Sequence, residues 1–313
     1  MTANPAADPA PAVRVGSPTE ERNPRTADLD LMSTREVLSL INTEDRRVPV
    51  AVGAALDAIA AAVDLAVGAL SAGCRVHYFG AGTSGRLAVL DAVELPPTYN
   101  APGDWFCVHL AGGRDAMWRA VEDAEDDGPA GTKEAAECVR PGDVAVGITA
   151  SGRTPFVVSA LQTAAATGAR TVLVAGDPLA RASTEVDVFI GIDTGPEVVA
   201  GSTRMKAATA QKLALNAFST AVMVRLGRVY SNFMVDMVAT NAKLRGRMIS
   251  ILVEATGFDE EICTEAVGQA GGDLRLALVT LLSGAGHQDA RRALGDTGQR
   301  VRDAISLLSD PRL

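Results

Sequence analysis

The sequence predicts an α/β protein in which helices cover both faces of a parallel sheet, followed by a small helical domain. Three observations support this prediction. Five short apolar runs alternate with helical patterns between residues 75 and 192, which is the rhythm of a parallel sheet. Hydrophobic residues make up 47% of the chain but aromatic residues only 4%, so Ala, Val and Leu must fill the core. From about residue 249 onward only short Ala- and Leu-rich helical patterns remain.

The chain opens with an Ala- and Pro-rich stretch, residues 1–18, that has no face to pack and is expected to be disordered. This stretch lacks the basic and apolar regions of a secretory signal, so we expect a cytoplasmic protein. Residues 19–46 should form a polar arm and a short helix. The helix is predicted to begin at Ser33, because Ser33 and Glu36 have the spacing of a capping box before an apolar face.

One long helix rich in Ala, Val and Leu is predicted from residue 47 to residue 72. It is almost long enough to span a membrane. Asp57 and Asp64 are seven residues apart, however, which places both carboxylates on one face of an amphipathic helix. We therefore expect this helix to be buried against the sheet or against a partner subunit.

Every polar, Gly-bearing loop in the next part of the chain follows a predicted strand. Helical patterns at 85–94, 114–125, 154–167 and 178–184 separate most of the strands. Ligands of parallel sheets bind beyond the carboxyl ends of the strands, so the loops should form a single site. The predicted strands are 75–80, 105–110, 143–149, 171–175 and 188–192.

The loop after the first strand reads G-A-G-T-S-G-R and begins at Gly80. Glycines let the backbone approach a ligand, and the N–H groups at a helix start favour an anion. A P-loop is excluded because Arg86 stands where Lys is required. A dinucleotide site fits poorly. Such a site needs an acidic residue about 20 residues after the loop, and the only candidate, Asp104, lies before the second strand and not at its end. A phosphate ester suits this loop better, and a structural turn without a ligand is the alternative. The proposed phosphate ligands are Thr83, Ser84 and Gly85, together with Ser151, Gly152 and Thr154 of a later loop, and Arg86 is a further candidate for substrate binding.

Two later loops repeat this chemistry. A-S-G-R-T-P, residues 150–155, follows the third strand, and G-P-E-V-V-A-G-S-T-R-M-K, residues 195–206, follows the fifth and leads into a helix over 205–226. The recurrence weakens the view that these loops are merely well-capped helix starts. Glu197 is a candidate for contacting sugar hydroxyls or assisting ring opening. The candidates for substrate binding in the two loops are Ser151, Gly152, Arg153, Thr154, Glu197, Ser202, Thr203 and Lys206.

The charge balance disfavours nucleic acid and anionic membranes as partners, because the net charge is −9 and the sequence pI is about 4.9. An acidic protein needs local cations to hold an anionic substrate. These are expected from Arg86, Arg153, Arg204 and Lys206, although each could instead form a surface salt bridge. The four cysteines show no metal-ligand or disulfide spacing, so no metal is expected. His77, His109 and His287 are assigned no role.

The last part of the chain carries no chemical constellation. Residues 231–248 have apolar side chains at helical spacing, and three short helices are predicted after them. The expected breaks lie at Gly257, at Gly271-Gly272 and at Ser283-Gly284. We interpret this part as a domain for packing or dimerisation.

With these loops identified, the chain resembles the N-acetylmuramic acid 6-phosphate etherases of the sugar isomerase (SIS) superfamily. The resemblance covers nearly everything from Thr19 onward, and the chain departs from the family at Ala208, where Gly is expected. It implies a SIS three-layer sandwich over 47–230 and a small UBA-like helical domain over 231–313. It also implies a homodimer that uses neither nucleotide nor metal. The motifs that carry it are T-E-x-R-N-P at Thr19, G-A-G-T-S-G-R-L at Gly80, E-L-P-P-T at Glu94, A-V-E-D-A-E-D at Ala120, A-S-G-R-T-P at Ala150, G-S-T-R-M-K at Gly201 and V-D-M-V-A-T-N at Val235.

The activity implied by the resemblance is cleavage of the lactyl ether of N-acetylmuramic acid 6-phosphate, in cell-wall sugar recovery. The products are N-acetylglucosamine 6-phosphate and D-lactate. Ring opening exposes an aldehyde, removal of the C2 proton lets lactate leave C3, and water then adds at C3. Such a cycle needs a base and an acid but no redox cofactor. A sugar-phosphate isomerase and a non-catalytic sugar-phosphate-sensing regulator are the alternatives on this scaffold.

Glu94 and Glu125 are the candidate catalytic pair. Pro96 and Pro97 are expected to end the helix and hold Glu94 near the first loop. Glu125 is expected to close the helix after the second strand, in an acidic run that would otherwise suggest a solvated face. The resemblance implies that Glu94 protonates the departing lactate and then activates water, and that Glu125 removes the C2 proton.

Overall fold

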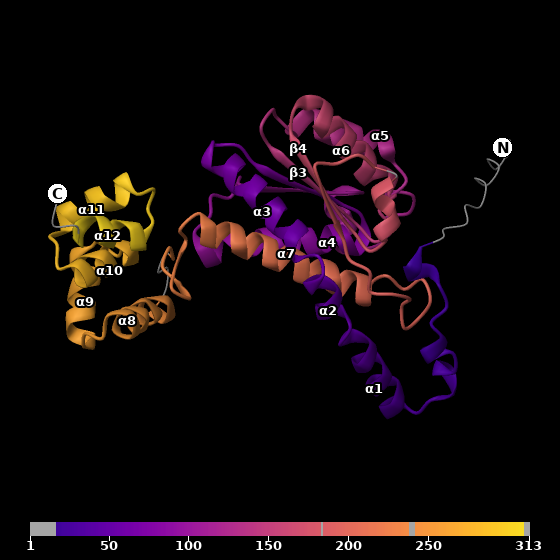
Figure 1. Ribbon diagram of the computed structural model, residues 1–313, viewed down its shortest axis with the longest axis horizontal. Coiled ribbons are helices and arrows are strands. Elements are labelled where there is room, and N and C mark those ends of the chain that lie inside the picture. Colours follow the sequence, from indigo (N-terminus) through magenta and orange to yellow (C-terminus); the bar gives the residue numbers. More distant parts are fainter. Residues whose placement is uncertain (1–16, 183, 238–241, 310–313) are drawn as a thin grey trace, which may run out of the picture.

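The computed structural model describes residues 17–182, 184–237 and 242–309. They form a three-layer α/β sandwich with a helical arm projecting on one side and a helical unit on the other (Figure 1). Most of the predicted tail, residues 1–16, lies outside the described residues, as does the end of the V-D-M-V-A-T-N motif. Ser17 is already buried, and Pro18 begins the first 3-10 turn of the arm.

The central sheet has five parallel strands in the order β2-β1-β3-β4-β5. Every residue of β1 and β3 is buried, because helices cover both faces. Gly80 pairs with Leu110 on one side and Ile148 on the other, so the carboxyl ends of three strands lie side by side. All five predicted strands are confirmed: β1 is Val76–Gly80, β2 Phe106–Leu110, β3 Val144–Thr149, β4 Arg170–Ala175 and β5 Val188–Gly191.

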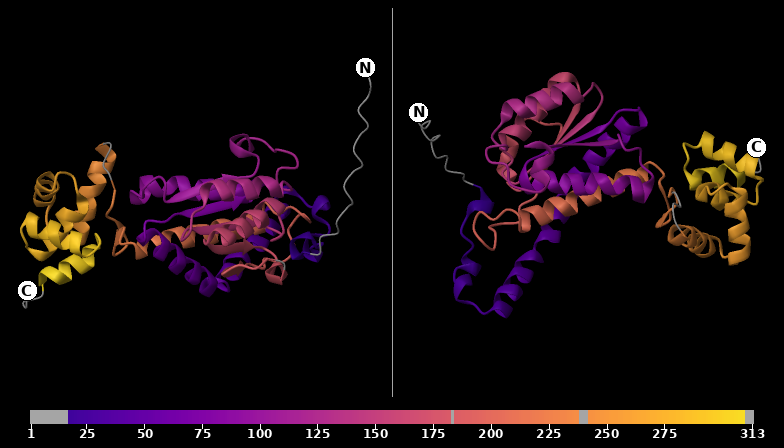
Figure 2. Two further views of the ribbon diagram at one scale, coloured as in Figure 1. Left: turned by 90° about the horizontal axis from the view of Figure 1, so that it is seen from above. Right: turned by 180° about the vertical axis from the view of Figure 1, so that it is seen from behind.

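Two hydrophobic cores lie on opposite faces of the sheet. One core joins the sheet to α3 (Leu56–Ser71), α4 (Gly82–Tyr99) and α7 (Lys206–Arg225). The other joins it to α5 (Gly128–Cys138) and α6 (Pro155–Thr167). Figure 2 shows the three layers from above and from behind. The predicted sandwich is therefore confirmed.

The arm begins with three 3-10 turns, η1 (Pro18–Glu20), η2 (Pro24–Thr26) and η3 (Leu29–Leu31). Helix α1, Thr34–Asp45, follows with the predicted capping box: Ser33 N–H donates to Glu36, and Glu36 N–H donates to Ser33 Oγ. This pairing satisfies two backbone donors that would otherwise be free at the helix start.

The single helix predicted over 47–72 is wrong. The structure has α2, Val48–Gly53, and α3, separated at Ala54 and Ala55, where Gly53 weakens the helix. Across the described residues, no single helix is long and apolar enough to cross a membrane. One pair bent by 58°, Thr34–Ala54 with Leu56–Ser71, passes that test on length and composition alone. Helix α3 buries Ala62 and Ala66 completely in the core.

Helix α4 does not end at its prolines, contrary to the prediction. It continues through Pro96 and Pro97 to Tyr99. Proline has no backbone N–H to donate, but its fixed φ is compatible with a helix. Asn100 ends it instead, with a φ of 49° and its N–H on the carbonyl of Pro96. The side chain of Glu94 is therefore held by a regular helix and not by a helix end.

The helix predicted over 114–125 is also wrong. A 3-10 segment, η4 (Gly113–Met117), and a series of turns occupy this region, and α5 follows at Gly128. Asp127 caps α5 by accepting from Ala130 N–H, and Pro129 stands in its first turn. Glu125 accordingly lies in a turn before α5. The segment predicted at 178–184 is a 3-10 helix, η5 (Pro178–Ala182).

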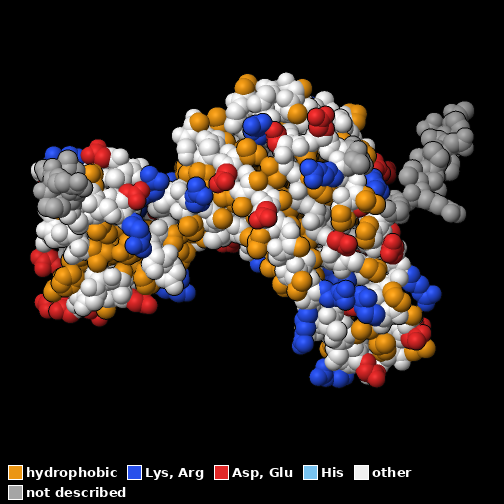
Figure 3. Space-filling model, viewed as in Figure 1, with side chains coloured by type: hydrophobic (Ala, Val, Ile, Leu, Met, Phe, Trp, Pro, Cys, Tyr) orange, Lys and Arg blue, Asp and Glu red, His pale blue; other side chains and the backbone are white. Residues whose placement is uncertain are grey.

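The chain beyond α7 differs from the prediction in two respects. A short hairpin, β6 (Val229–Tyr230) with β7 (Phe233–Met234), replaces the start of the predicted helical segment. Five helices then pack around their own core. On the face seen in Figure 3, hydrophobic patches lie on the surface of both this helical unit and the sandwich. The predicted glycine breaks are present, but the helices are more numerous: α8 Ala242–Thr256, α9 Glu260–Gln269, α10 Leu274–Ser283, α11 His287–Asp296 and α12 Val301–Ser309.

Candidate active site

A polar pocket of about 390 Å³ lies at the carboxyl ends of β1 and β3. Five segments far apart in the sequence line it: the arm, the start of α4, the turn before α5, the loop after β3, and the loop before α7 together with α7. This is the edge at which ligands of parallel sheets bind. The lining side chains with polar groups are Thr19, Glu20, Thr83, Ser84, Glu125, Thr149, Ser151, Thr154, Thr203 and Gln211.

The first loop places the start of α4 directly on the sheet. A Cβ on Gly85 would lie 2.3 Å from Leu110 Cδ1 and 2.7 Å from the carbonyl oxygen of Gly80, so no side chain fits there. Because the first N–H groups of a helix have no intrahelical acceptor, the α4 start offers main-chain donors where Thr83 and Ser84 line the pocket. This arrangement suits a phosphate.

Gln211 of α7 adds a donor that the sequence reasoning missed. Ser84 Oγ donates to Gln211 Oε1 over 2.8 Å, which leaves the amide nitrogen, Nε2, buried without a partner among the described residues. A buried unsatisfied N–H is costly, and a phosphate or hydroxyl oxygen of a ligand would satisfy it. The sequence offers one signal for Gln211, which is a polar residue on a helix face that also buries Ala207, Ala210 and Ala214.

The loop after β3 is shaped by local hydrogen bonds. Thr149 and Thr154 hydroxyls lie 2.7 Å apart, and Gly152 N–H donates to Thr149 Oγ1 over 3.3 Å. Gly152 has a φ of 73°, and a Cβ there would be 2.2 Å from that of Ala180. Ser151 and Thr154 line the pocket, so two of the four residues predicted from this loop do so.

None of the predicted cations lines the pocket. Arg86 donates to the carbonyls of Ala116 and Arg119, and Arg153 pairs with buried Asp177 over 2.9 Å. Arg204 and Ser202 also lie outside the lining. Among the described residues, the donors that line the pocket are N–H, hydroxyl and amide groups, and no Lys or Arg side chain lines it.

Lys206 and Glu197 belong to a buried network beside the pocket, and both are 0% exposed. Lys206 Nζ donates to Glu44 Oε2 over 3.0 Å and to the carbonyl of Thr194 over 2.9 Å. The hydrogen bond from Arg25, with the contacts of Lys206 and Asn23, lowers the pKa of Glu44 to about 2 despite burial. The network ties the arm and α1 to α7.

Glu197 caps the start of α7. Its two oxygens accept from the N–H groups of Lys206 and Ala207, each over 2.9 Å. Burial raises the pKa of the Glu197 carboxyl, and the two backbone donors oppose that shift. Glu197 therefore orients the loop that carries Thr203 and does not itself line the pocket.

The structure does not bring Glu94 and Glu125 together. Glu125 lines the pocket, is exposed and has a carboxylate without a partner among the described residues. Its carbonyl accepts from Phe156 N–H over 3.1 Å, which fixes the turn against α6. Glu94 is exposed on α4, 11 residues beyond Thr83, or about 16 Å along the helix axis.

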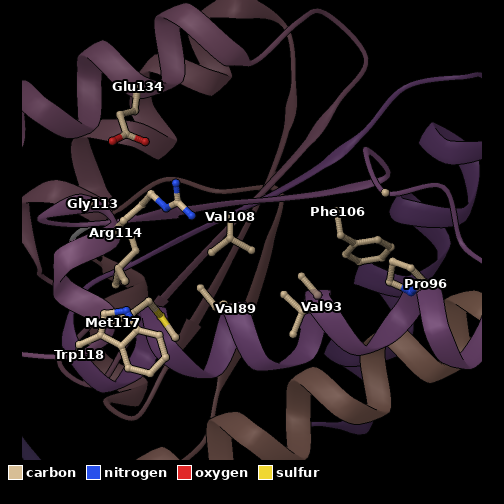
Figure 4. Close-up of a pocket in the computed structure, with 13 residues that line it drawn as sticks. Val89, Val93, Pro96, Phe106, Val108, Gly113, Arg114, Met117, Trp118 and Glu134 are labelled. Carbon is tan, nitrogen blue, oxygen red and sulfur yellow. The ribbon is translucent and has the colours of Figure 1, made fainter.

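A larger groove of about 740 Å³ lies between α4, β2 and η4. Figure 4 shows Val89 and Val93 of α4 facing Val108 of β2, with Met117 and Trp118 at one end. Of the large apolar side chains here, Val93 is 56% and Trp118 87% exposed. The lining is mainly apolar and holds none of the predicted site residues, so the smaller polar pocket is the candidate active site.

Comparisons with known proteins agree with this architecture. Residues 58–165 match the family model described as the glucokinase regulatory protein N-terminal SIS domain, and residues 126–221 match that of the SIS domain. A phosphoheptose isomerase from Francisella tularensis superposes with a TM-score of 0.50 at 18% identity, covering 62% of this chain and 100% of that one. The sheet, its helices and the pocket at its carboxyl edge thus define a SIS-domain protein.

Relatives that match almost the whole chain identify the family within the class of SIS-domain proteins. The N-acetylmuramic acid 6-phosphate etherase of Thermobifida fusca is 59% identical, and the match covers 88% of this chain and 90% of that one. The etherase of Symbiobacterium thermophilum is 50% identical over 85% of this chain and 89% of its own. The chain belongs to the N-acetylmuramic acid 6-phosphate etherase family, which confirms the resemblance found in the motifs.

Proposed function

We propose that the protein is a carbon–oxygen lyase that cleaves the D-lactyl ether of N-acetylmuramic acid 6-phosphate. The products are N-acetylglucosamine 6-phosphate and D-lactate, in the recycling of peptidoglycan amino sugars. The observation that carries the proposal is one pocket that combines an anion-binding helix start with the unpaired carboxylate of Glu125. The 59% identity to an etherase over 88% of the chain supports the choice of substrate.

The phosphate is held by the start of α4 and by neutral side-chain donors. The N–H groups of Thr83 and Ser84 and the hydroxyl of Thr83 face it together with Ser151, Thr154 and the free amide N–H of Gln211. Fixed dipoles can hold an anion without a cation because their N–H groups are already oriented. An acidic protein can thus bind an acidic substrate even though its own Arg and Lys side chains near the pocket are paired with other protein groups.

The reaction runs through the open-chain aldehyde. Glu125 takes the proton from C2, and the resulting enolate expels the C3 oxygen, which leaves as lactate with a proton from Glu94. Water then adds at C3 of the unsaturated aldehyde as Glu94 takes its proton, and a proton returns to C2. Each carboxylate alternates between acid and base, so no electrons are gained or lost overall.

Glu94 reaches this chemistry from a second copy of the chain. It lies beside Val93 on the surface of α4, where Leu90 and Val93 are 50% and 56% exposed, and Trp118, which follows η4, is 87% exposed. Exposed apolar surface next to a groove is typical of an interface, and a two-fold dimer uses the same surface on both subunits. A homodimer built on α4 would therefore bring each Glu94 toward the other subunit.

The cytoplasm is the compartment in which we place the reaction. The substrate carries a phosphate and a carboxylate and does not cross a membrane unaided. All four cysteines are free thiols, which suits a reducing compartment.

The function is tested by incubating the purified protein with N-acetylmuramic acid 6-phosphate in deuterated water. We expect D-lactate, measured enzymatically, and deuterium at C2 of the product sugar, measured by NMR. An isomer of the substrate with inverted configuration at C2, formed without lactate, would identify an isomerase. Sugar-phosphate binding without any reaction would identify a sensor, and either outcome contradicts the etherase.

A further inference from the structure

We propose that Glu20, on the N-terminal arm, is a substrate-binding residue that accepts hydrogen bonds from the uncharged part of the bound sugar phosphate. The proposal rests on the proposed function for the identity of the ligand. Glu20 lies more than 60 residues before the first strand-end loop in sequence, yet it lines the same pocket as Glu125 and Thr83.

The backbone of the arm is fixed where it forms the pocket wall. Thr19 is only 2% exposed, its hydroxyl lies 3.0 Å from Ser17 Oγ, and its carbonyl accepts from Gly201 N–H over 3.3 Å. Glu20 closes the η1 turn that these contacts hold. Its side chain therefore starts from a defined position.

The loop before α7 leaves room for the Glu20 carboxylate. Gly201 has a φ of 74°, and a Cβ at this position would lie 3.0 Å from Glu20 Oε2. A side chain at Gly201 would thus be strained and would also crowd the carboxylate. The glycine allows the carboxylate to lie directly against the backbone.

The next residues anchor the arm a second time. Asn23 donates to Glu44 over 3.1 Å and to the carbonyl of Pro196 over 3.3 Å, and Thr26 Oγ1 donates to the carbonyl of Val198 over 2.8 Å. Through Glu44 the arm is also linked to Lys206. Two anchors, one on each side of Arg22, keep Glu20 at the pocket.

The Glu20 carboxylate has no partner among the residues that the structure describes. An unpaired carboxylate at this position is available to accept hydrogen bonds from a ligand. It would repel a phosphate, as would Glu125, whereas the start of α4 attracts one. Glu20 therefore meets the hydroxyl or acetamido N–H groups of the sugar and sets the direction in which the phosphate enters.

The test compares Glu20→Gln, Glu20→Asp and wild type by calorimetric titration with N-acetylglucosamine 6-phosphate and, separately, with inorganic phosphate. Glu21→Gln is the matched control, because Glu21 is the exposed neighbour outside the pocket lining. Loss of a hydrogen bond to a charged acceptor should weaken sugar-phosphate binding about tenfold or more in Glu20→Gln. Inorganic phosphate should bind Glu20→Gln at least as tightly as wild type, because a repelling charge is removed. Glu20→Asp should recover part of the loss of sugar-phosphate binding, and Glu21→Gln should show no loss.

Unchanged sugar-phosphate binding in Glu20→Gln would overturn the proposal. So would an equal loss for both probes, because that result would mean a displaced arm. In the lactate assay we expect Glu20→Gln to raise KM more than it lowers kcat. If the wild type releases no D-lactate, the proposed function fails, while the titrations still decide the role of Glu20.

Discussion

Two groups of titratable side chains in the sandwich differ in how they are paired. In the pocket, Glu20 and Glu125 are exposed and have no partner among the described residues. Between β1, β2 and α5, a chain of groups, buried except for the half-exposed Glu134, is paired at every step. Unpaired groups remain available to a ligand, whereas paired groups stabilise the fold. The unpaired carboxylates of the pocket are therefore the candidates for chemistry, whereas the paired groups belong to the scaffold.

This chain runs from buried Asp143 through His77 and His109 to Glu134, whose side chain is 39% exposed. Asp143 accepts from backbone N–H groups and lies 3.2 Å from His77 Nε2, so that nitrogen carries a proton. Burial lowers the pKa of His77 to about 4, which makes its Nδ1 an acceptor at neutral pH. His109 Nε2 then donates over 3.1 Å, and His109 Nδ1 lies 2.9 Å from Glu134 Oε2.

The largest effect is expected on catalysis in the pocket. Glu125→Gln and Glu94→Gln should each lower the rate of D-lactate release by about 10² to 10⁴-fold, with an unchanged urea midpoint because neither carboxylate is paired. After subunit exchange, the two variants mixed should regain about a quarter of wild-type activity, since one site in each mixed dimer keeps both glutamates. Asp126→Asn, in the same exposed turn, is the control. A mixture that stays inactive would contradict a shared site.

The opposite behaviour is expected for a buried partner. Lys206→Met removes a fully buried ammonium from Glu44 and should lower the free energy of unfolding by about 3–5 kcal/mol, measured by urea denaturation. Lys133→Met, on the exposed side of α5, should change it by less than about 0.5 kcal/mol. Equal stabilities of the two variants would show that the Lys206 network contributes little.

The smallest effect concerns the pH dependence of stability. His77 in the unfolded chain binds a proton below about pH 6.5, whereas in the folded protein it does so only near pH 4. The unfolded state thus binds more protons at His77 in this window, and the contribution of His77 to stability should fall by about 3 kcal/mol as the pH drops from 6.5 to 4. Asp91, whose pKa burial raises to about 6, opposes this trend.

Comparison with His77→Gln isolates the histidine, since Asp91 titrates in both proteins. The variant should lose stability less steeply over this window in urea titrations at successive pH values. An identical slope would mean that His77 does not resist protonation in the fold.

Local patterns in the sequence were enough to predict the five strands, the capping box and the strand-end loops. The partners of Arg86, Arg153 and Lys206 could not be predicted, because they lie on segments distant in the sequence. Helix α5 was missed although Asp127 and Pro129 are start signals, since the G-P-A-G run also reads as a break. Gly131 is needed there because a Cβ would lie 2.0 Å from the carbonyl oxygen of Phe156.

The domain limits at residues 18, 46 and 230 remain predictions. Glu20 and Gln211 were not found because their importance depends on where the arm and α7 pass over the sheet. Neither position follows from periodicity. Only the fold brings these two side chains to the same pocket as Thr83.

Because Gly80 and Gly85 are in close contact, the start of α4 is difficult to change in evolution. The arm and the turn that carries Glu125 are not restricted in this way. The donors at the start of α4 are peptide groups, which survive almost any side-chain substitution. Their position depends on two residues that tolerate no Cβ, as a Cβ on Gly80 would lie 2.8 Å from Gly85. New sugar preferences can therefore arise through the arm and the turn that carries Glu125, while recognition of the phosphate is retained.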